Sequence, residues 1–92
     1  MGYSTAIDLA NSGISLEQSI EYHLRGNHFP PVPTSMVRPC IEAIDAYNNE
    51  DYDLEITLPE GITCGGSKTA SASKIISAHH LDAWLDTEEG EY

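Results

Sequence analysis

Hydrophobic positions recur with a helical period in the segment from residue 15 to residue 26. Ser15 can cap this helix, and Gln18 is placed to reach back to it in a capping box. Gly26 supplies a left-handed C-terminal stop. The apolar face consists of residues that lie four positions apart, which are Leu16, Ile20 and Leu24. The pattern predicts a helix here, and a weaker helical pattern covers residues 3–11.

A second helical period runs from about Ser35 to Asn48. Thr34 or Ser35 is expected to cap this helix, and Pro39 falls in its opening turn, where a missing N–H costs little. Its stripe consists of Val37, Ile41 and Ile44, flanked by Met36, Cys40 and Tyr47. The prolines that precede it, within residues 30–33, predict an extended polyproline-like strap with Phe29 and Val32 pinned to the core.

Residues 54–58 alternate between apolar and polar side chains, which is the period of a half-buried strand. A turn at residues 59–61 and a short apolar segment at 62–64 predict a β-hairpin, broken afterwards by Gly65 and Gly66. Because an isolated hairpin is marginally stable in water, we expect it to pack against helices or another chain.

The last predicted element is a helix from about Ala70 to Asp86, capped by Ser71 or Ser73. Its apolar residues lie on several sides, which is typical of a helix buried on several sides. In so short a chain the extra side is a candidate oligomer interface, for which we select Ile76, Leu81 and Trp84. Residues 87–92 are acidic and are expected to be a frayed tail.

Together these elements predict an α+β fold in a single domain over residues 1–92, with two or three N-terminal helices, a β-hairpin and a C-terminal helix. No repeat or low-complexity linker divides the chain. A domain of this size buries only about 60% of the surface of its unfolded chain, so its core is thin.

The net charge is the most unusual global feature of the sequence. Fifteen carboxylates oppose four lysines and arginines, for a formal net charge of −11. Such a field repels nucleic acid and anionic membrane surfaces and attracts basic partners. We therefore expect no direct nucleic-acid binding and no membrane association. No apolar run approaches the roughly 18 residues that span a bilayer. The N-terminus lacks the basic region of an export signal, so we expect a cytoplasmic protein with reduced thiols.

One stretch of the chain holds carboxylates with no lysine or arginine among them. The simplest interpretation is a solvated surface that aids solubility. The alternative is a face that docks onto a basic protein surface and imitates a polyanion. The residues selected for such a face are Glu42, Asp45, Glu50, Asp51, Asp53 and Glu55. A calcium loop is disfavoured, because residues 48–53 lack the central glycine and terminal glutamate of an EF-hand.

Other chemistry finds little support in the sequence. The histidines and cysteines of the chain are His23, His28, His79, His80, Cys40 and Cys64. Their spacing is not typical of a zinc site, so we expect no metal and no cofactor. Residues 61–69 nearly match a phosphate-binding loop, but a serine precedes the Lys-Thr pair, and a flexible connection or a simple anion nest is the better interpretation. No nucleophile elbow is present, and we assign no catalytic residue.

The segment 23–33, followed by 35–37 and 40–44, resembles an uncharacterised group of short actinobacteriophage proteins. The likeness extends to the late element at 79–82 and covers about two-thirds of the chain. The group carries no assigned activity, so the resemblance implies no site residues. It implies a setting, which is the cytoplasm of an infected bacterial host cell.

In that setting the leading hypothesis is a non-enzymatic protein that binds and modulates a host or phage protein through its acidic face. The alternative is a small homo-oligomeric structural or assembly factor. A third possibility is an accessory protein that binds a metal ion or an anion. Salt-sensitive capture of a basic protein, salt-resistant self-association, and a ligand-dependent melting temperature would distinguish the three.

Overall fold

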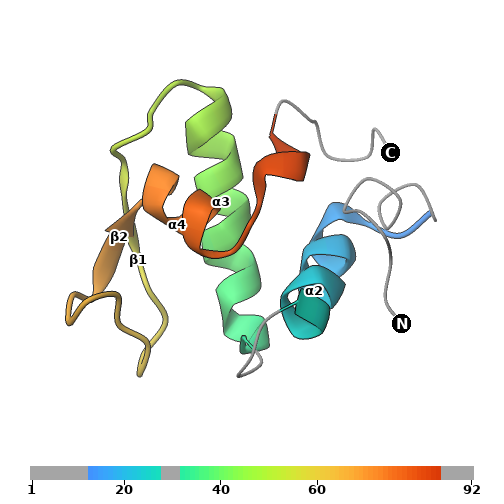
Figure 1. Ribbon diagram of the computed structural model, residues 1–92, viewed down its shortest axis with the longest axis horizontal. Helices are drawn as coiled ribbons and strands as arrows, with labels where there is room; N and C mark the ends of the chain where they lie inside the picture. Colours follow the sequence, from blue (N-terminus) through green and yellow to red (C-terminus); the bar gives the residue numbers. More distant parts are fainter. Residues whose placement is uncertain (1–12, 28–31, 86–92) are drawn as a thin grey trace.

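Residues 13–27 and 32–85 are described in the computed structural model of the chain (Figure 1). The elements in chain order are α2 (Leu16–Asn27), the 3-10 helix η1 (Thr34–Met36), α3 (Val37–Asn48), β1 (Glu55–Thr57), β2 (Thr69–Ser71), α4 (Ala72–Ala78) and the 3-10 helix η2 (Asp82–Trp84). Helices and an antiparallel two-stranded hairpin confirm the α+β prediction. The expected helix over residues 3–11, Phe29 and the tail at 87–92 lie outside the described residues.

Helix α2 begins at the predicted capping box. The Ser15 hydroxyl accepts a hydrogen bond from the Gln18 N–H at 3.2 Å, and the Gln18 side-chain oxygen accepts one from the Ser15 N–H at 3.4 Å. The predicted stop is wrong. Gly26 lies inside the helix, which continues to Asn27, and it is not among the described glycines with positive φ.

Helix α3 starts two residues later than predicted, at Val37, because the chain first makes the 3-10 turn η1. The prediction of a Thr34 or Ser35 cap is wrong, since neither helix start has a side-chain cap hydrogen bond. Pro39 does fall in the first turn of α3, where it is buried. Pro33, with φ −64° and ψ 152°, has the expected polyproline conformation.

Helix α3 ends in a Schellman motif. Glu50 adopts the left-handed conformation, with φ 64°. The Glu50 N–H donates to the Tyr47 carbonyl at 3.0 Å, and the Asp51 N–H donates to the Ala46 carbonyl at 2.8 Å. These two bonds satisfy carbonyls that the helix end would otherwise leave unpaired. The chain is thereby turned toward β1.

The hairpin forms with a different partner from the predicted one. Strand β1 pairs with β2, with Ile56 opposite Ala70, and not with residues 62–64. The turn at 59–61 does form, but a second tight turn follows it, in which Cys64 and Ser67 exchange backbone hydrogen bonds at 2.8 and 3.0 Å. Gly65 and Gly66, both with positive φ, form the tip of this turn and postpone the return strand to Thr69–Ser71.

The predicted helix over residues 70–86 is broken into two pieces. Ala70 belongs to β2, and α4 runs only from Ala72 to Ala78. Ser71 is its cap and accepts a hydrogen bond from the Lys74 N–H at 3.3 Å. The left-handed conformation of His80, with φ 55°, interrupts the helical path before η2.

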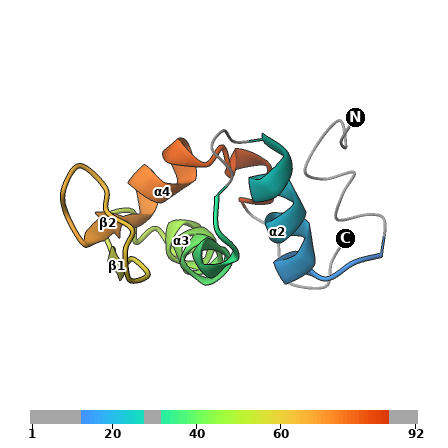
Figure 2. The ribbon, with the colours of Figure 1, turned by 90° about the horizontal axis from the view of Figure 1, so that it is seen from below.

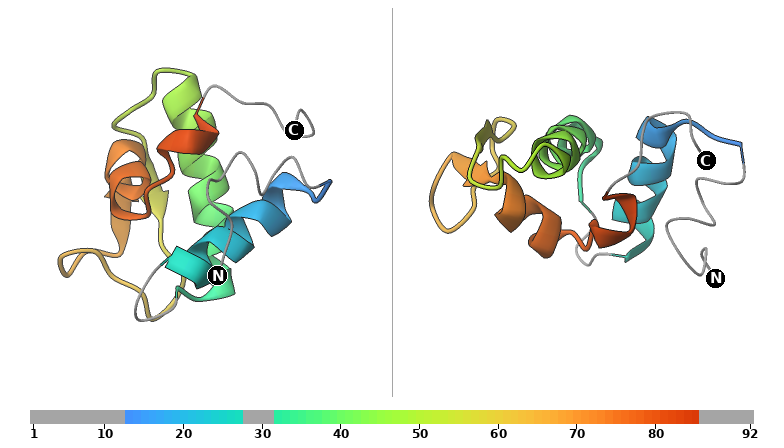
Figure 3. Two further views of the ribbon diagram at one scale, coloured as in Figure 1. Left: turned by 45° about the vertical axis from the view of Figure 1, so that its right-hand side comes forward. Right: turned by 90° about the horizontal axis from the view of Figure 1, so that it is seen from above.

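Helix α3 lies between α2 on one side and α4 with the hairpin on the other (Figure 2). The views in Figure 3 show the same arrangement, with η2 folded back toward α2. The core between these elements is apolar, and its most completely buried large side chains are Trp84, Ile20, Leu24, Ile44 and Leu81. This packing leaves one side of α3 and the loop after it exposed to solvent.

Candidate functional site

The six selected carboxylates are all exposed, and we call them the acidic face: Glu42, Asp45, Glu50, Asp51, Asp53 and Glu55. Glu42 and Asp45 lie three residues apart on α3, so they share its solvent-facing side. The next three follow the end of α3, and Glu55 begins β1. All six carboxylates are therefore exposed, and they lie within residues 42–55 of the chain.

The two arginines of the chain pair with carboxylates that do not belong to the acidic face. Arg25 pairs with Glu21 at 3.3 Å, and Arg38 on α3 pairs with Glu17 at 3.1 Å. Among the described residues, no ion pair involves a carboxylate of the acidic face. The Glu55 carboxylate accepts a hydrogen bond from the Thr69 hydroxyl at 2.6 Å, which is a neutral partner. The carboxylates of the acidic face are therefore not neutralised by an ion pair with another described residue.

Two large apolar side chains are exposed among these carboxylates. Tyr52 is 44% exposed and Leu54 is 45% exposed. The Tyr52 ring meets the Tyr47 ring edge-on, with centroids 4.6 Å apart, which restricts its orientation. The alternating pattern placed Leu54 inward with Ile56, and this prediction is wrong because Leu54 precedes β1 and stays at the surface. Sequence periodicity contained no signal for either exposed side chain.

The residues selected for an oligomer interface are in the wrong place for that role. Ile76 is 3% exposed, and Leu81 and Trp84 are 0% exposed. The chain turns at His80, so Leu81 and Trp84 fold back into the core and do not project from a continuous helix. A second subunit cannot reach these side chains in this fold, and the selection is corrected.

His23 has a structural position, whereas His28 lies outside the described residues. The His23 ring contacts Trp84 edge-on, with centroids 4.8 Å apart, and its Nε2 lies 2.9 Å from the His79 carbonyl oxygen. Cys40 and Cys64 are free thiols, and burial raises the pKa of Cys40 to about 12. Over residues 13–27 and 32–85, no group of three or more histidine, cysteine or acidic side chains could hold a metal ion.

The segment that nearly matches a phosphate-binding loop has a different structure from one. Residues 59–67 form two tight turns, and strand β2 follows them before α4 begins. A phosphate-binding loop leads directly into a helix N-terminus, so this segment lacks the required geometry. The segment instead shapes one wall of a groove.

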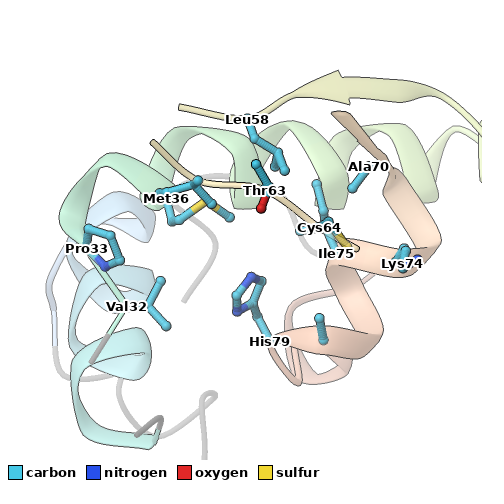
Figure 4. A pocket seen from close by; sticks show the side chains of 12 residues that line it. Val32, Pro33, Met36, Leu58, Thr63, Cys64, Ala70, Lys74, Ile75 and His79 are labelled. Carbon is cyan, nitrogen blue, oxygen red and sulfur yellow. The ribbon is translucent and has the colours of Figure 1, made fainter. Parts of the chain in front are cut away.

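This groove has a volume of about 330 Å³ and lies between η1, the hairpin loop and α4 (Figure 4). One side consists of Val32, Pro33 and Met36. The hairpin contributes Leu58, Ile62, Thr63, Cys64 and Ala70, and α4 with the residue after it contributes Lys74, Ile75, Ala78 and His79. Figure 4 shows the His79 ring pointing into the space between the two sides. No pattern in the sequence predicted this groove, because its shape depends on how β2 pairs.

The chain matches no protein-family model, and comparison with curated proteins and with solved structures finds no match either. In the part of the chain that the structure describes, no helix combines the length and the apolar character needed to cross a membrane.

Proposed function

We propose that this chain is a small non-enzymatic protein, of bacteriophage origin, that binds and modulates a host or phage protein with a basic surface. The observation that carries the proposal is the acidic face, whose six carboxylates are exposed and have no ion-pair partner among the described residues. A face built of uncompensated carboxylates complements clustered lysines and arginines, such as those of a nucleic-acid-binding site.

The exposed apolar side chains give the same face a means of holding a partner. Long-range attraction between opposite charges speeds association, but tight binding needs side chains that become buried at the centre of the interface. Tyr52 and Leu54 lie between Asp51, Asp53 and Glu55 in the chain and are suited to that role. Tyrosine is enriched in protein interfaces because it combines a large apolar surface with a polar end.

A pull-down from an actinobacterial lysate, washed at low and at high salt, tests the proposal. The first variant combines Glu42→Gln, Asp45→Asn and Asp53→Asn. Its control combines Glu88→Gln, Glu89→Gln and Glu91→Gln, which change the net charge equally, from −11 to −11 + 3 = −8. We expect the wild type and the control to retain one basic protein at low salt, and the face variant to lose it.

The variant Tyr52→Ala then tests whether the partner is bound by a specific contact or only attracted by charge. If Tyr52 anchors the partner, its removal weakens capture by about tenfold or more while the net charge is unchanged. If the face variant and the control lose the partner to the same extent, only the total charge matters and the proposal fails. A mass above that of a monomer that persists at high salt, with no partner captured, would favour the homo-oligomeric alternative instead.

A further inference from the structure

Within the described residues, the groove between η1, the hairpin loop and α4 also has the character of a binding site. Its volume of about 330 Å³ lies at the lower end of the range of small-molecule sites, which runs from roughly 300 to 1,000 Å³. Its walls are mainly aliphatic, with Val32 and Met36 facing Leu58 and Ile75 (Figure 4). A ligand that fits such walls has an apolar body.

The charge of the groove differs from that of the rest of the molecule. The chain has fifteen carboxylates and four lysines and arginines, yet none of the described residues that line the groove is acidic. The lining does include Lys74, whose side chain is exposed and forms no ion pair with another described residue. An apolar groove with one lysine at its edge (Figure 4) complements a ligand with an apolar body and one negative charge at its end.

We infer that this groove binds a small aliphatic carboxylate of the medium-chain fatty-acid class, with the chain against the aliphatic walls and the carboxylate at Lys74. The net charge of −11 opposes the approach of any anion. At physiological salt that repulsion is screened beyond about 8 Å, whereas a direct contact between Lys74 and a carboxylate is screened much less. The site is separate from the acidic face, so it adds to the proposed protein-binding role and does not depend on it.

Octanoate is the probe, added to the full-length ¹⁵N-labelled chain below its micelle concentration and followed by NMR. We expect saturable shifts of the amide signals of Leu58, Cys64, Lys74 and Ile75, and no comparable change along the acidic face. Hexanoate, which has two fewer CH₂ groups, should bind about tenfold more weakly. Absence of saturable shifts in the groove, or equal affinity for the two acids, would overturn the inference.

A pair of lysine variants tests the role of the charge. Lys74→Gln should weaken octanoate binding by about fivefold and leave binding of the neutral analogue octanol unchanged. Lys68→Gln makes the same change of net charge at an exposed lysine that does not line the groove, and it should leave octanoate affinity within twofold of wild type. Equal effects of the two substitutions would indicate nonspecific attraction and overturn the assignment of Lys74.

A pair of alanine variants tests the place of binding. Ala78 lines the groove and Ala83 does not, and both side chains are exposed, so phenylalanine is tolerated at either position without disturbing the core. Ala78→Phe should abolish octanoate binding by filling the groove, and Ala83→Phe should not change it. Loss of binding in both variants, or in neither, would place the ligand elsewhere.

Two other occupants would also overturn the inference, and the same spectra detect them. Signals of the groove that shift with protein concentration in the absence of octanoate would assign it to a second copy of the chain. Groove signals that respond to Phe29→Ala but not to octanoate would assign it to a neighbouring segment of the same chain.

Discussion

The Nε2 atom of His23 lies 2.9 Å from the backbone carbonyl oxygen of His79, across 56 residues of sequence. A carbonyl oxygen can only accept a hydrogen bond, so Nε2 carries the proton. The same ring contacts Trp84 edge-on. His23 therefore joins α2 to the end of α4 and to η2, the two pieces into which the expected long helix is divided.

Removal of this link should destabilise the fold. His23→Ala loses a part-buried hydrogen bond and a ring contact, which together contribute about 1–3 kcal/mol to the free energy of unfolding. His23→Gln can still place an amide N–H near the His79 carbonyl, so it should recover part of the loss. Urea unfolding measures both variants. Equal stability of His23→Ala and wild type would show that the link contributes nothing.

The left-handed conformation of Glu50 makes it a site of backbone strain. Glu50→Gly should stabilise the chain by about 1 kcal/mol, because glycine adopts a positive φ without steric cost. Glu60→Gly is the matched control. This substitution also removes an exposed glutamate side chain, but from a turn residue without positive φ. It should therefore destabilise the chain slightly. Thermal unfolding measures both. A Glu50→Gly variant that is no more stable than Glu60→Gly would contradict the assignment of strain.

Burial of the Cys40 thiol predicts a loss of stability at high pH. Burial raises the pKa of Cys40 from 9.0 to about 12, so the folded state disfavours the thiolate. Below 9.0 the thiol is neutral in both states and this contribution is complete. Between 9.0 and about 12 only the unfolded chain ionises, and the free energy of unfolding falls by up to about 1.4 kcal/mol per pH unit.

Cysteine variants isolate this contribution from the other groups that titrate in the same range. Cys40→Ala should lower stability at every pH through lost packing, but it should show a smaller decline above 9.0 than the wild type. Cys64→Ala, which removes the other thiol of the chain, is the control variant. Chemical unfolding measured at several pH values compares the three proteins, and parallel pH profiles for wild type and Cys40→Ala would rule out the explanation.

Some sequence signals that act within four residues predicted the structure, whereas the Gly26 stop and the Thr34 or Ser35 cap did not. The Ser15–Gln18 capping box and the helical stripe through Ile20 depend only on neighbouring residues, and both are present. The choice of strand partner depends on competition between distant segments. Gly65 and Gly66 form a tight turn, whereas the sequence predicted only the end of a strand there. The partner of β1 is therefore β2 and not residues 62–64.

The same limit explains which site residues were missed. Exposure of the acidic face followed from charge alone, because unpaired carboxylates are costly to bury. Burial of Leu81 and Trp84 depends on the turn at His80, and the helical pattern of residues 70–86 did not predict this turn. Exposure of Leu54 depends on where β1 begins, and strand boundaries are poorly defined by periodicity.

The sequence offered two caps for α4, and the structure distinguishes them. The Ser71 hydroxyl accepts a hydrogen bond from the Lys74 N–H, whereas Ser73 lies inside the helix and uses its backbone N–H to reach the Tyr52 carbonyl at 3.0 Å. Ser71→Ala should cost about 1 kcal/mol of stability, and Ser73→Ala should change it by less than about 0.5 kcal/mol. Urea unfolding gives both values. Amide exchange adds a local readout, because only Ser71→Ala should speed exchange of the Lys74 N–H. Equal losses in the two variants would contradict the capping role and point to packing of the first turn of α4 as the common cause.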